Sequence, residues 1–178
     1  MATLLKSNQQ NTQKSKDISG IVGILTNQLV GEKCQAVRFS YGDELCLHYG
    51  ELTNYDHPSL QELQKGSWCL RTRATPWILK QDLKILVDSE ESETEDEIAI
   101  AKELVITVLT NQKLLKIATN PENLGLQLSF SEKLELLLQP DEEIDHDLDY
   151  WELFTPDEKV LKIGAGYNRS YKSIHDRN

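Results

Sequence analysis

The side chains best suited to chemistry are three thiols and one imidazole in the first half of the chain. They are Cys34, Cys46, Cys69 and His48. If residues alternate along the strands, all four fall on one face of a sheet. Thiolates with imidazole can bind zinc, but such ligands come in close pairs, and the steps between these cysteines are 12 and 23 residues. We therefore predict buried thiols that pack as small hydrophobic groups, with no metal or cofactor site.

A cysteine close to a histidine also suggests nucleophilic catalysis. Cys46 and His48 lie two residues apart on one strand face, where an imidazole could take a proton from a thiol. The chain contains no Gly-x-Ser-x-Gly elbow, phosphate-binding glycine loop, His-Glu-x-x-His motif or dinucleotide fingerprint. We predict that the protein is not an enzyme, and keep catalysis by Cys46 and His48 as an alternative.

Carboxylates are concentrated in two segments of the second half. The first comprises Asp88, Glu90, Glu91, Glu93, Glu95, Asp96 and Glu97, and the second Asp141, Glu142, Glu143, Asp145, Asp147 and Asp149. The spacing over Asp141–Glu152 resembles a calcium-binding EF-hand loop, but His146 stands where the turn needs glycine, and a predicted strand follows. We predict that both segments form an acidic surface that binds a basic protein, with calcium binding as the alternative.

The charge balance limits the kinds of partner. Residues 1–80 hold nine basic and seven acidic side chains, a net +2, whereas residues 81–178 hold ten and twenty-two, a net −12. Such a surface repels phosphate backbones, so a protein partner is predicted and nucleic acid is not. No window approaches the roughly 18 unbroken apolar residues that would cross a bilayer. Three widely separated cysteines fit the reducing cytoplasm, and nothing indicates an oligomeric state.

The elements that must position these groups follow from periodicity. A disordered leader is predicted over 1–16, then a helix from Asp17 that ends at Gly31. Alternating apolar residues predict strands over 34–41, 45–50 and 67–73, with a fourth strand starting at Pro76–Trp77. Trp77, beside its proline, is predicted to be partly exposed and to anchor a partner.

In the second half, the acidic tract 88–97 is predicted to be a linker, and a helix is predicted from Ile98. Two hairpins should follow, the first placing Leu126, Leu128 and Phe130 opposite Leu134, Leu136 and Leu138. The second should turn at Thr155-Pro156-Asp157-Glu158.

A repeat connects the two halves. Trp68-Leu70-Thr72 matches Trp151-Leu153-Thr155 at an offset of 83 residues, and Leu29, Lys33 and Val37 match Leu109, Lys113 and Ile117 at an offset of 80. We predict an α+β, mostly β fold of two tandem helix-plus-antiparallel-meander repeats sharing one core. The predicted organisation is 1–16 leader, 17–87 first repeat, 88–97 linker, 98–166 second repeat and 167–178 polar tail.

Two stretches resemble a family of small, uncharacterised bacterial β-rich proteins. They are Leu29–Gly50 and Tyr150–Gly166, where the Trp-Glu-Leu strand, Pro-Asp turn and glycine-rich close are similar to that family's ending. Glu158 stands where the family usually has a turn glycine. The resemblance implies a β-rich fold and, because some such proteins are suspected immunity proteins, an inhibitor or immunity-type role; it implies no catalytic residues.

Overall fold

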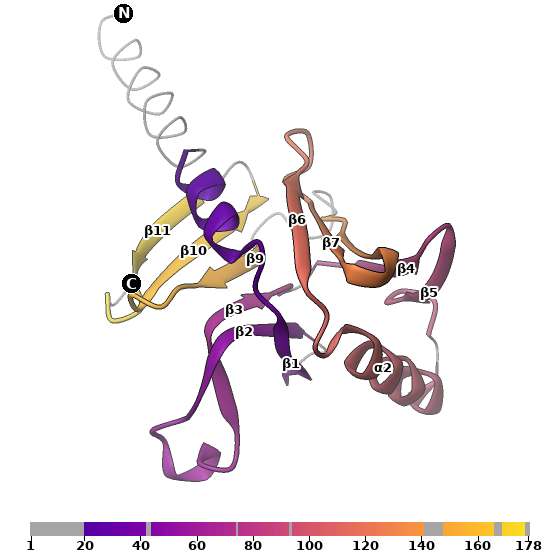
Figure 1. Cartoon of the computed structure of the whole chain (residues 1–178), viewed down its shortest axis with the longest axis horizontal. Helices are drawn as coiled ribbons and strands as arrows, with labels where there is room; N and C mark the ends of the chain where they lie inside the picture. The colour runs from indigo at the N-terminus through magenta and orange to yellow at the C-terminus, as the bar shows by residue number, and fades with distance from the viewer. Residues whose placement is uncertain are drawn as a thin grey trace, which may run out of the picture.

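The computed structural model describes residues 20–41, 44–73, 75–92, 94–140, 148–165 and 169–176. Within them the chain forms a mostly β, α+β fold of two antiparallel sheets and two α-helices (Figure 1). The predicted leader 1–16 lies outside the described residues. None of the described helices is long and apolar enough to cross a membrane.

The first half begins with the predicted helix. Its described part covers residues 20–29, buries Val22, Leu25 and Leu29, and is followed by Gly31 at a φ of 102°, which ends the helix as expected. The strands of this half are β1 (Cys34–Phe39), β2 (Leu45–Asn54), β3 (Gln64–Arg71), β4 (Trp77–Gln81) and β5 (Lys84–Asp88), with a short 3-10 turn, η2 (Pro58–Leu60).

The second half also begins with a helix, and six strands follow it. It comprises α2 (Glu95–Leu109), β6 (Leu114–Thr119), β7 (Leu126–Phe130), η3 (Ser131–Lys133), β8 (Leu134–Leu138), β9 (Asp149–Phe154), β10 (Lys159–Gly164) and β11 (Arg169–Ser173). Both predicted hairpins are confirmed: Leu128 pairs with Leu136 in the first, and Leu161 pairs with Leu153 in the second.

Each sheet combines strands from both halves. The six-stranded sheet runs β1-β2-β3-β9-β10-β11, and the five-stranded sheet runs β5-β4-β8-β7-β6. A three-stranded meander from one half is therefore extended by strands from the other, through β3 paired with β9 and β4 paired with β8. Figure 1 shows the two sheets side by side, with β11 at one end of the molecule and β5 and α2 at the other.

The two sheets also meet where their outer strands begin. Lys33 forms a bridge with Lys113, and backbone hydrogen bonds flank it, including the Gly31 N–H to the Leu114 carbonyl at 2.8 Å. One cluster of buried residues includes side chains from both sheets, among them Leu47, Trp151, Leu128 and Leu79. Because each apolar face needs cover, the sheets are stabilised together rather than separately.

Three local expectations are corrected. The strands β5 and β11 were not predicted, and β11 occupies part of the segment expected to be a polar tail. Helix α2 starts at Glu95, within the acidic tract, because Thr94 caps it and Glu97 reaches back to the Thr94 N–H at 3.1 Å. The two matched tryptophans are not equivalent: Trp68 lies in the third strand after its helix and Trp151 in the fourth strand after α2. Their strands, β3 and β9, are neighbours in one sheet.

Separating the halves tests whether each sheet needs the other half. Glu90 and Glu91 are both exposed, so the chain can be divided between them into two fragments. Each fragment then lacks the strands that pair with its meander in the full chain. We expect neither fragment alone to unfold cooperatively, and an equimolar mixture to recover a cooperative thermal transition followed by circular dichroism. A cooperative transition for either fragment alone would contradict this arrangement.

The turn between β9 and β10 offers a second test. Glu158 has a φ of 56°, the left-handed region that glycine tolerates best. Its side chain meets His175 at 3.1 Å, but both groups are largely exposed, so this pair adds little. Glu158→Gly should raise the free energy of unfolding by about 0.5–1 kcal/mol in urea titrations. Glu158→Ala keeps the strain and is the control; a glycine variant no more stable than the alanine variant would refute this explanation.

Candidate functional site

A cluster of thiols and guanidinium groups lies on the outer face of the six-stranded sheet. Cys46 in β2 stands directly between Arg38 of β1 and Arg71 of β3 in the strand register, and His48 stands opposite Cys69. We call these five residues the thiol–arginine cluster. Sequence reasoning placed Arg71 on the same face as Cys69 but missed Arg38 as a neighbour of Cys46, because the β1–β2 register depends on a bulge.

That bulge removes Cys34 from the predicted set. The register shifts between Cys34 and Ala36, so Cys34 pairs with Tyr49 and enters the core. Its Sγ donates to the Ala36 carbonyl at 3.7 Å, and burial raises the pKa of this thiol to about 12. The zinc alternative thereby loses one of its ligands, and in the described part of the chain no three His, Cys, Asp or Glu side chains converge on a possible metal position.

The two remaining thiols, Cys46 and Cys69, differ in the direction of their pKa shifts. Interaction with the Cys69 thiol lowers the pKa of Cys46 to about 7, against the effect of burial and with help from Arg71. The same interaction raises the pKa of Cys69, which therefore stays protonated. The Arg71 guanidinium lies 4.6 Å from the centroid of the Phe154 ring, which holds it over this part of the sheet. Cys46 is thus the acidic member of the pair.

His48 does not supply the base that the enzyme alternative requires. Its Nδ1 accepts a hydrogen bond from the Gly66 N–H at 3.2 Å, so in the neutral ring the proton is on Nε2. Burial, then Arg38 and Arg71, lower the pKa of His48 to about 4. Cys46 and His48 share a face as predicted, but a ring whose only lone pair already binds Gly66 cannot also take the thiol proton.

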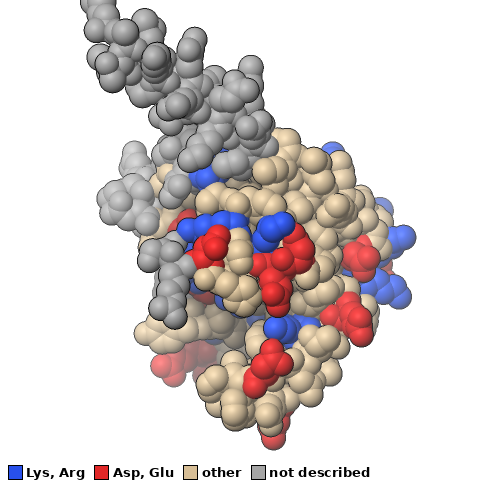
Figure 2. Space-filling model, turned by 90° about the vertical axis from the view of Figure 1, so that its left-hand side faces the viewer, with Lys and Arg blue, Asp and Glu red and all other residues tan. Residues whose placement is uncertain are grey.

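Next to this cluster, acidic and basic side chains form a chain of ion pairs. Arg73 lies 2.6 Å from Glu44 and 3.7 Å from Glu152, and Lys162 lies 2.6 Å from Glu152 and 3.0 Å from Asp149. Figure 2 shows charges of both signs interleaved on the face that it displays. Two oxygen donors of the calcium alternative, Asp149 and Glu152, therefore already bind a lysine, which works against a cation at that place.

The first acidic segment, 88–97, spans the end of one strand and the start of a helix. Asp88 ends β5, Glu90 and Glu91 follow it, and the last three carboxylates form the first turn of α2. Carboxylates there complement the positive end of the helix dipole. The described members without an ion pair to a described cation are Asp88, Glu90, Glu91, Glu95 and Asp96. Glu93, and Asp141, Glu142, Glu143, Asp145 and Asp147 of the second segment, lie outside the described residues.

The tertiary structure brings the starting points of the two acidic segments together. Within the five-stranded sheet, β4 lies between β5 and β8; Asp88 pairs with Ile78, and Leu138 pairs with Trp77. The Ser89 N–H donates to the Trp77 carbonyl at 3.0 Å, and the Gln139 N–H donates to the Pro76 carbonyl at 2.9 Å. The strands that precede the two segments, β5 and β8, thus end at the same end of the sheet, about 10 Å apart, two strand spacings.

Trp77 itself is not the exposed anchor that we predicted. Its side chain is 6% exposed, and its ring centroid lies 6.1 Å from that of Phe39. The proline before it starts a central strand, with β5 on one side and β8 on the other, which buries the ring. Its backbone, rather than its side chain, organises the ends of the acidic segments.

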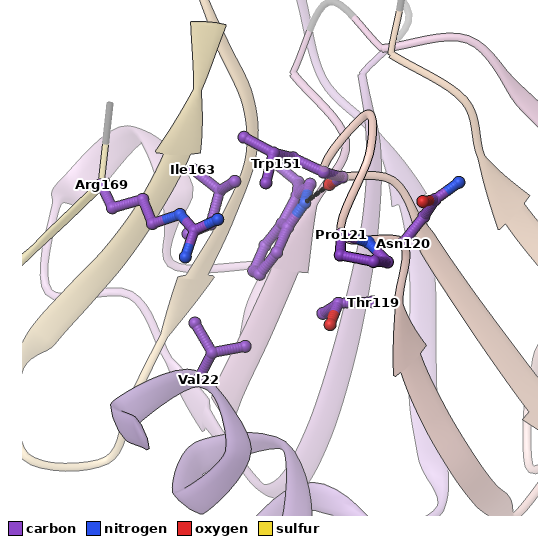
Figure 3. Close-up of a pocket in the computed structure, with 8 residues that line it drawn as sticks. Val22, Thr119, Asn120, Pro121, Trp151, Ile163 and Arg169 are labelled. Atoms are coloured by element: carbon purple, nitrogen blue, oxygen red, sulfur yellow. Dashed lines mark hydrogen bonds between the residues drawn. The ribbon is translucent and has the colours of Figure 1, made fainter. Parts of the chain in front are cut away.

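A small cavity lies beneath the first helix, around Trp151. Figure 3 shows the Trp151 ring at its centre, Val22 on the helix, Arg169 reaching in from β11, and Pro121 on the opposite side. The indole N–H donates to the Leu124 carbonyl at 2.8 Å. The cavity encloses about 130 Å³, and a comparable one of about 90 Å³ lies against Trp77 under α2. Both are well below the roughly 300–1,000 Å³ of ordinary small-molecule pockets.

These features define a protein of the mostly β, α+β class with a buried thiol pair beside two arginines on one sheet, and with five carboxylates near the end of β5 that have no ion pair among the described residues. No family model, curated protein or solved structure matches the chain. What it does must therefore be argued from its own residues.

The buried imidazole predicts a specific loss of stability in mild acid. Because the pKa of His48 falls from 6.5 to about 4 on folding, the unfolded state binds the proton first. Stability present above pH 6.5 should be lost as the pH falls toward 4, by about 2–3 kcal/mol in urea titrations. His48→Asn retains an acceptor for the Gly66 N–H and should flatten this dependence, whereas His57→Asn, at an exposed position, should not. An unchanged pH slope in His48→Asn would show that another group is responsible.

Proposed function

We propose that the protein is a non-catalytic, cytoplasmic interaction protein that binds a basic protein through the acidic surface formed by 88–97 and 141–149. The observation that carries the proposal is the common origin of both segments at one end of the five-stranded sheet, on either side of β4. Together they contain thirteen carboxylates and no lysine or arginine. Such a concentration of one charge attracts a basic surface over a distance of about a Debye length.

The distribution of ion pairs supports this choice of surface. On the outer face of the six-stranded sheet, Glu44, Asp149 and Glu152 are neutralised by Arg73 or Lys162. In the acidic tract, Asp88, Glu90, Glu91, Glu95 and Asp96 have no such counter-charge among the described residues. A surface whose charges are not satisfied within the molecule gains most from a partner that supplies cations, and loses that gain in salt.

One further feature favours binding over catalysis. His48 is engaged with Gly66, so the Cys46–His48 alternative lacks a free base. Three free, buried thiols are compatible with a reducing cytoplasm. The resemblance at Leu29–Gly50 and Tyr150–Gly166 is a reason to place inhibitors of basic enzymes first among the possible roles.

We also infer that the two halves derive from one duplicated helix-plus-meander unit. The first helix precedes β1–β3 as α2 precedes β6–β8, Leu29 and Leu109 are both fully buried, and Lys33 and Lys113 pair with each other. In this scheme Trp151 corresponds to Trp77 instead of Trp68, because each lies in the first strand of the hairpin that joins the other sheet. The inference makes no demand on function.

Salt-dependent capture tests the proposed surface. The immobilised full chain should retain a basic protein from lysate of the native cell at ~0.05 M salt. At ~0.5 M salt the amount retained should be at least tenfold lower. The triple variant Glu90→Gln, Glu91→Gln, Asp96→Asn should reduce capture about tenfold, because the lost charge lies on the proposed surface.

A charge-matched variant controls for net charge alone. Glu51→Gln, Glu62→Gln, Glu122→Gln removes three exposed carboxylates elsewhere and should leave capture within about twofold. Capture that ignores salt, or that falls equally in both triple variants, would contradict the proposal.

A further inference from the structure

We propose that Cys46 and Cys69 form a peroxide-reactive dithiol site, in which Cys46 is oxidised first and Cys69 resolves it. The site lies on the outer face of the six-stranded sheet, on β2 and β3, whereas the acidic tract begins at the end of β5 in the five-stranded sheet. It is independent of the proposed binding function, so either can fail without the other.

The first step of the argument is the pairing of the two sulfur atoms. Arg71 stands opposite Cys46, and Cys69 stands opposite His48, so the two cysteines are diagonal neighbours on β2 and β3. The Cys46 Sγ donates to the Glu44 carbonyl at 3.8 Å, and the two thiols influence each other: interaction with Cys69 lowers the pKa of Cys46, and the same interaction raises the pKa of Cys69. A thiol that lowers the pKa of its neighbour favours the neighbour's thiolate and is already placed to react with it.

The second step is the charge around Cys46. Arg38 and Arg71 flank it in register from β1 and β3. The Glu44 carboxylate, which acts in the opposite sense, accepts from the Ser40 hydroxyl at 2.8 Å and is held by Arg73 at 2.6 Å. His48, on the same strand face, is neutral near pH 7. The Cys69 thiol first, and then Arg71, lower the pKa of Cys46 against the effect of burial, so a larger fraction of Cys46 is thiolate near neutral pH than for an ordinary cysteine.

The third step concerns a buried donor of the cluster that has no acceptor. The Nε–H of Arg71 is buried and has no hydrogen-bond partner in the described part of the chain. Buried donors are rarely left without an acceptor, and each such group needs an explanation. Oxidation of an adjacent sulfur adds an oxygen that can accept from a guanidinium, so a sulfenate at Cys46 would be stabilised where the thiol is not.

The chemistry requires a hydroperoxide as co-reactant. The Cys46 thiolate attacks one peroxide oxygen, the O–O bond breaks, and the departing hydroxide or alkoxide takes a proton, so the sulfur is oxidised and the peroxide reduced. The Cys69 sulfur then attacks the Cys46 sulfenic acid. An S–S bond forms, the S–O bond breaks, and the oxygen leaves as water with the Cys69 proton.

Geometry sets the order of these events. Diagonal cross-strand Cα atoms lie about 7–8 Å apart, whereas disulfides usually need about 4.4–6.8 Å. Closing the bond therefore needs a small movement of β2 against β3, which makes the sulfenic acid an intermediate long enough to trap. Cys46 and Cys69 are each only 5% exposed, so the site admits a small peroxide more readily than a bulky thiol reagent.

Peptide mass spectrometry of the intact chain tests the proposal with hydrogen peroxide as the probe. Trypsin cleavage after Lys33, Arg38, Lys65 and Arg71 puts each cysteine on its own peptide, so a Cys46–Cys69 disulfide is recognised as a linked pair. In the wild type we expect that linked pair to form near pH 7. In Cys69→Ala, a sulfenic-acid trap such as dimedone, added as the peroxide-treated chain is denatured, should label Cys46, and in Cys46→Ala neither product should appear.

Two further variants separate this site from a generally oxidisable thiol. Arg71→Met should slow Cys46 oxidation by about twofold or more, because Arg71 contributes to the lowered pKa of Cys46 while the Cys69 thiol, which contributes most, remains. Cys34→Ala should leave the rate unchanged, because Cys34 lies in the core with a raised pKa. Thermal melts confirm that each variant is folded. Oxidation of Cys46 no faster than that of free cysteine, or an Arg71→Met rate equal to the wild type, would overturn the proposal.

Discussion

The pairing of β3 with β9 and of β4 with β8 is the constraint on which the remaining structure depends. Each pairing joins strands from different halves of the chain, so neither sheet is complete until both halves are present. The crossing segment between β3 and β4 is fixed by buried threonines: the Thr75 hydroxyl donates to the Tyr150 carbonyl at 2.6 Å, and the Leu45 N–H donates to Thr72 at 3.1 Å. Contacts of such long range form slowly and late, but they join the two sheets into one cooperative core.

The same pairing of strands from different halves determines where the charged side chains lie. Bringing β9 beside β3 places Glu152 opposite Arg71, where Arg73 and Lys162 neutralise it at the edge of the thiol–arginine cluster. Because β4 lies between β5 and β8, the strands that precede the two acidic segments end at the same end of the five-stranded sheet. Glu44, Asp149 and Glu152 are therefore neutralised within the molecule, while Asp88, Glu90, Glu91, Glu95 and Asp96 have no ion pair to a cation among the described residues. One topological feature thus produces both a neutralised face and a charged edge.

Local pattern identified the elements whose contacts are local. The alternation Leu126-x-Leu128-x-Phe130 and the Pro156–Asp157 turn each define a hairpin without reference to the rest of the chain, and both formed as predicted. Strands β5 and β11 were missed because their residues are only partly buried and their alternation is weak. The predicted equivalence of Trp68 and Trp151 was wrong because similar residues on two adjacent strands of one sheet resemble a repeat when the strand order is unknown.

The sequence by itself determined the two helices, the hairpins, the mostly β class and the two acidic runs, since these depend on periodicity and composition over a few residues. The tertiary structure alone decided which strands are neighbours, and hence that Cys46 stands between two arginines, that a bulge sends Cys34 into the core, and that Trp77 is buried. The physical reason is register: a shift of one residue moves every side chain of a strand to the opposite face, and register is fixed by partners far away in the chain.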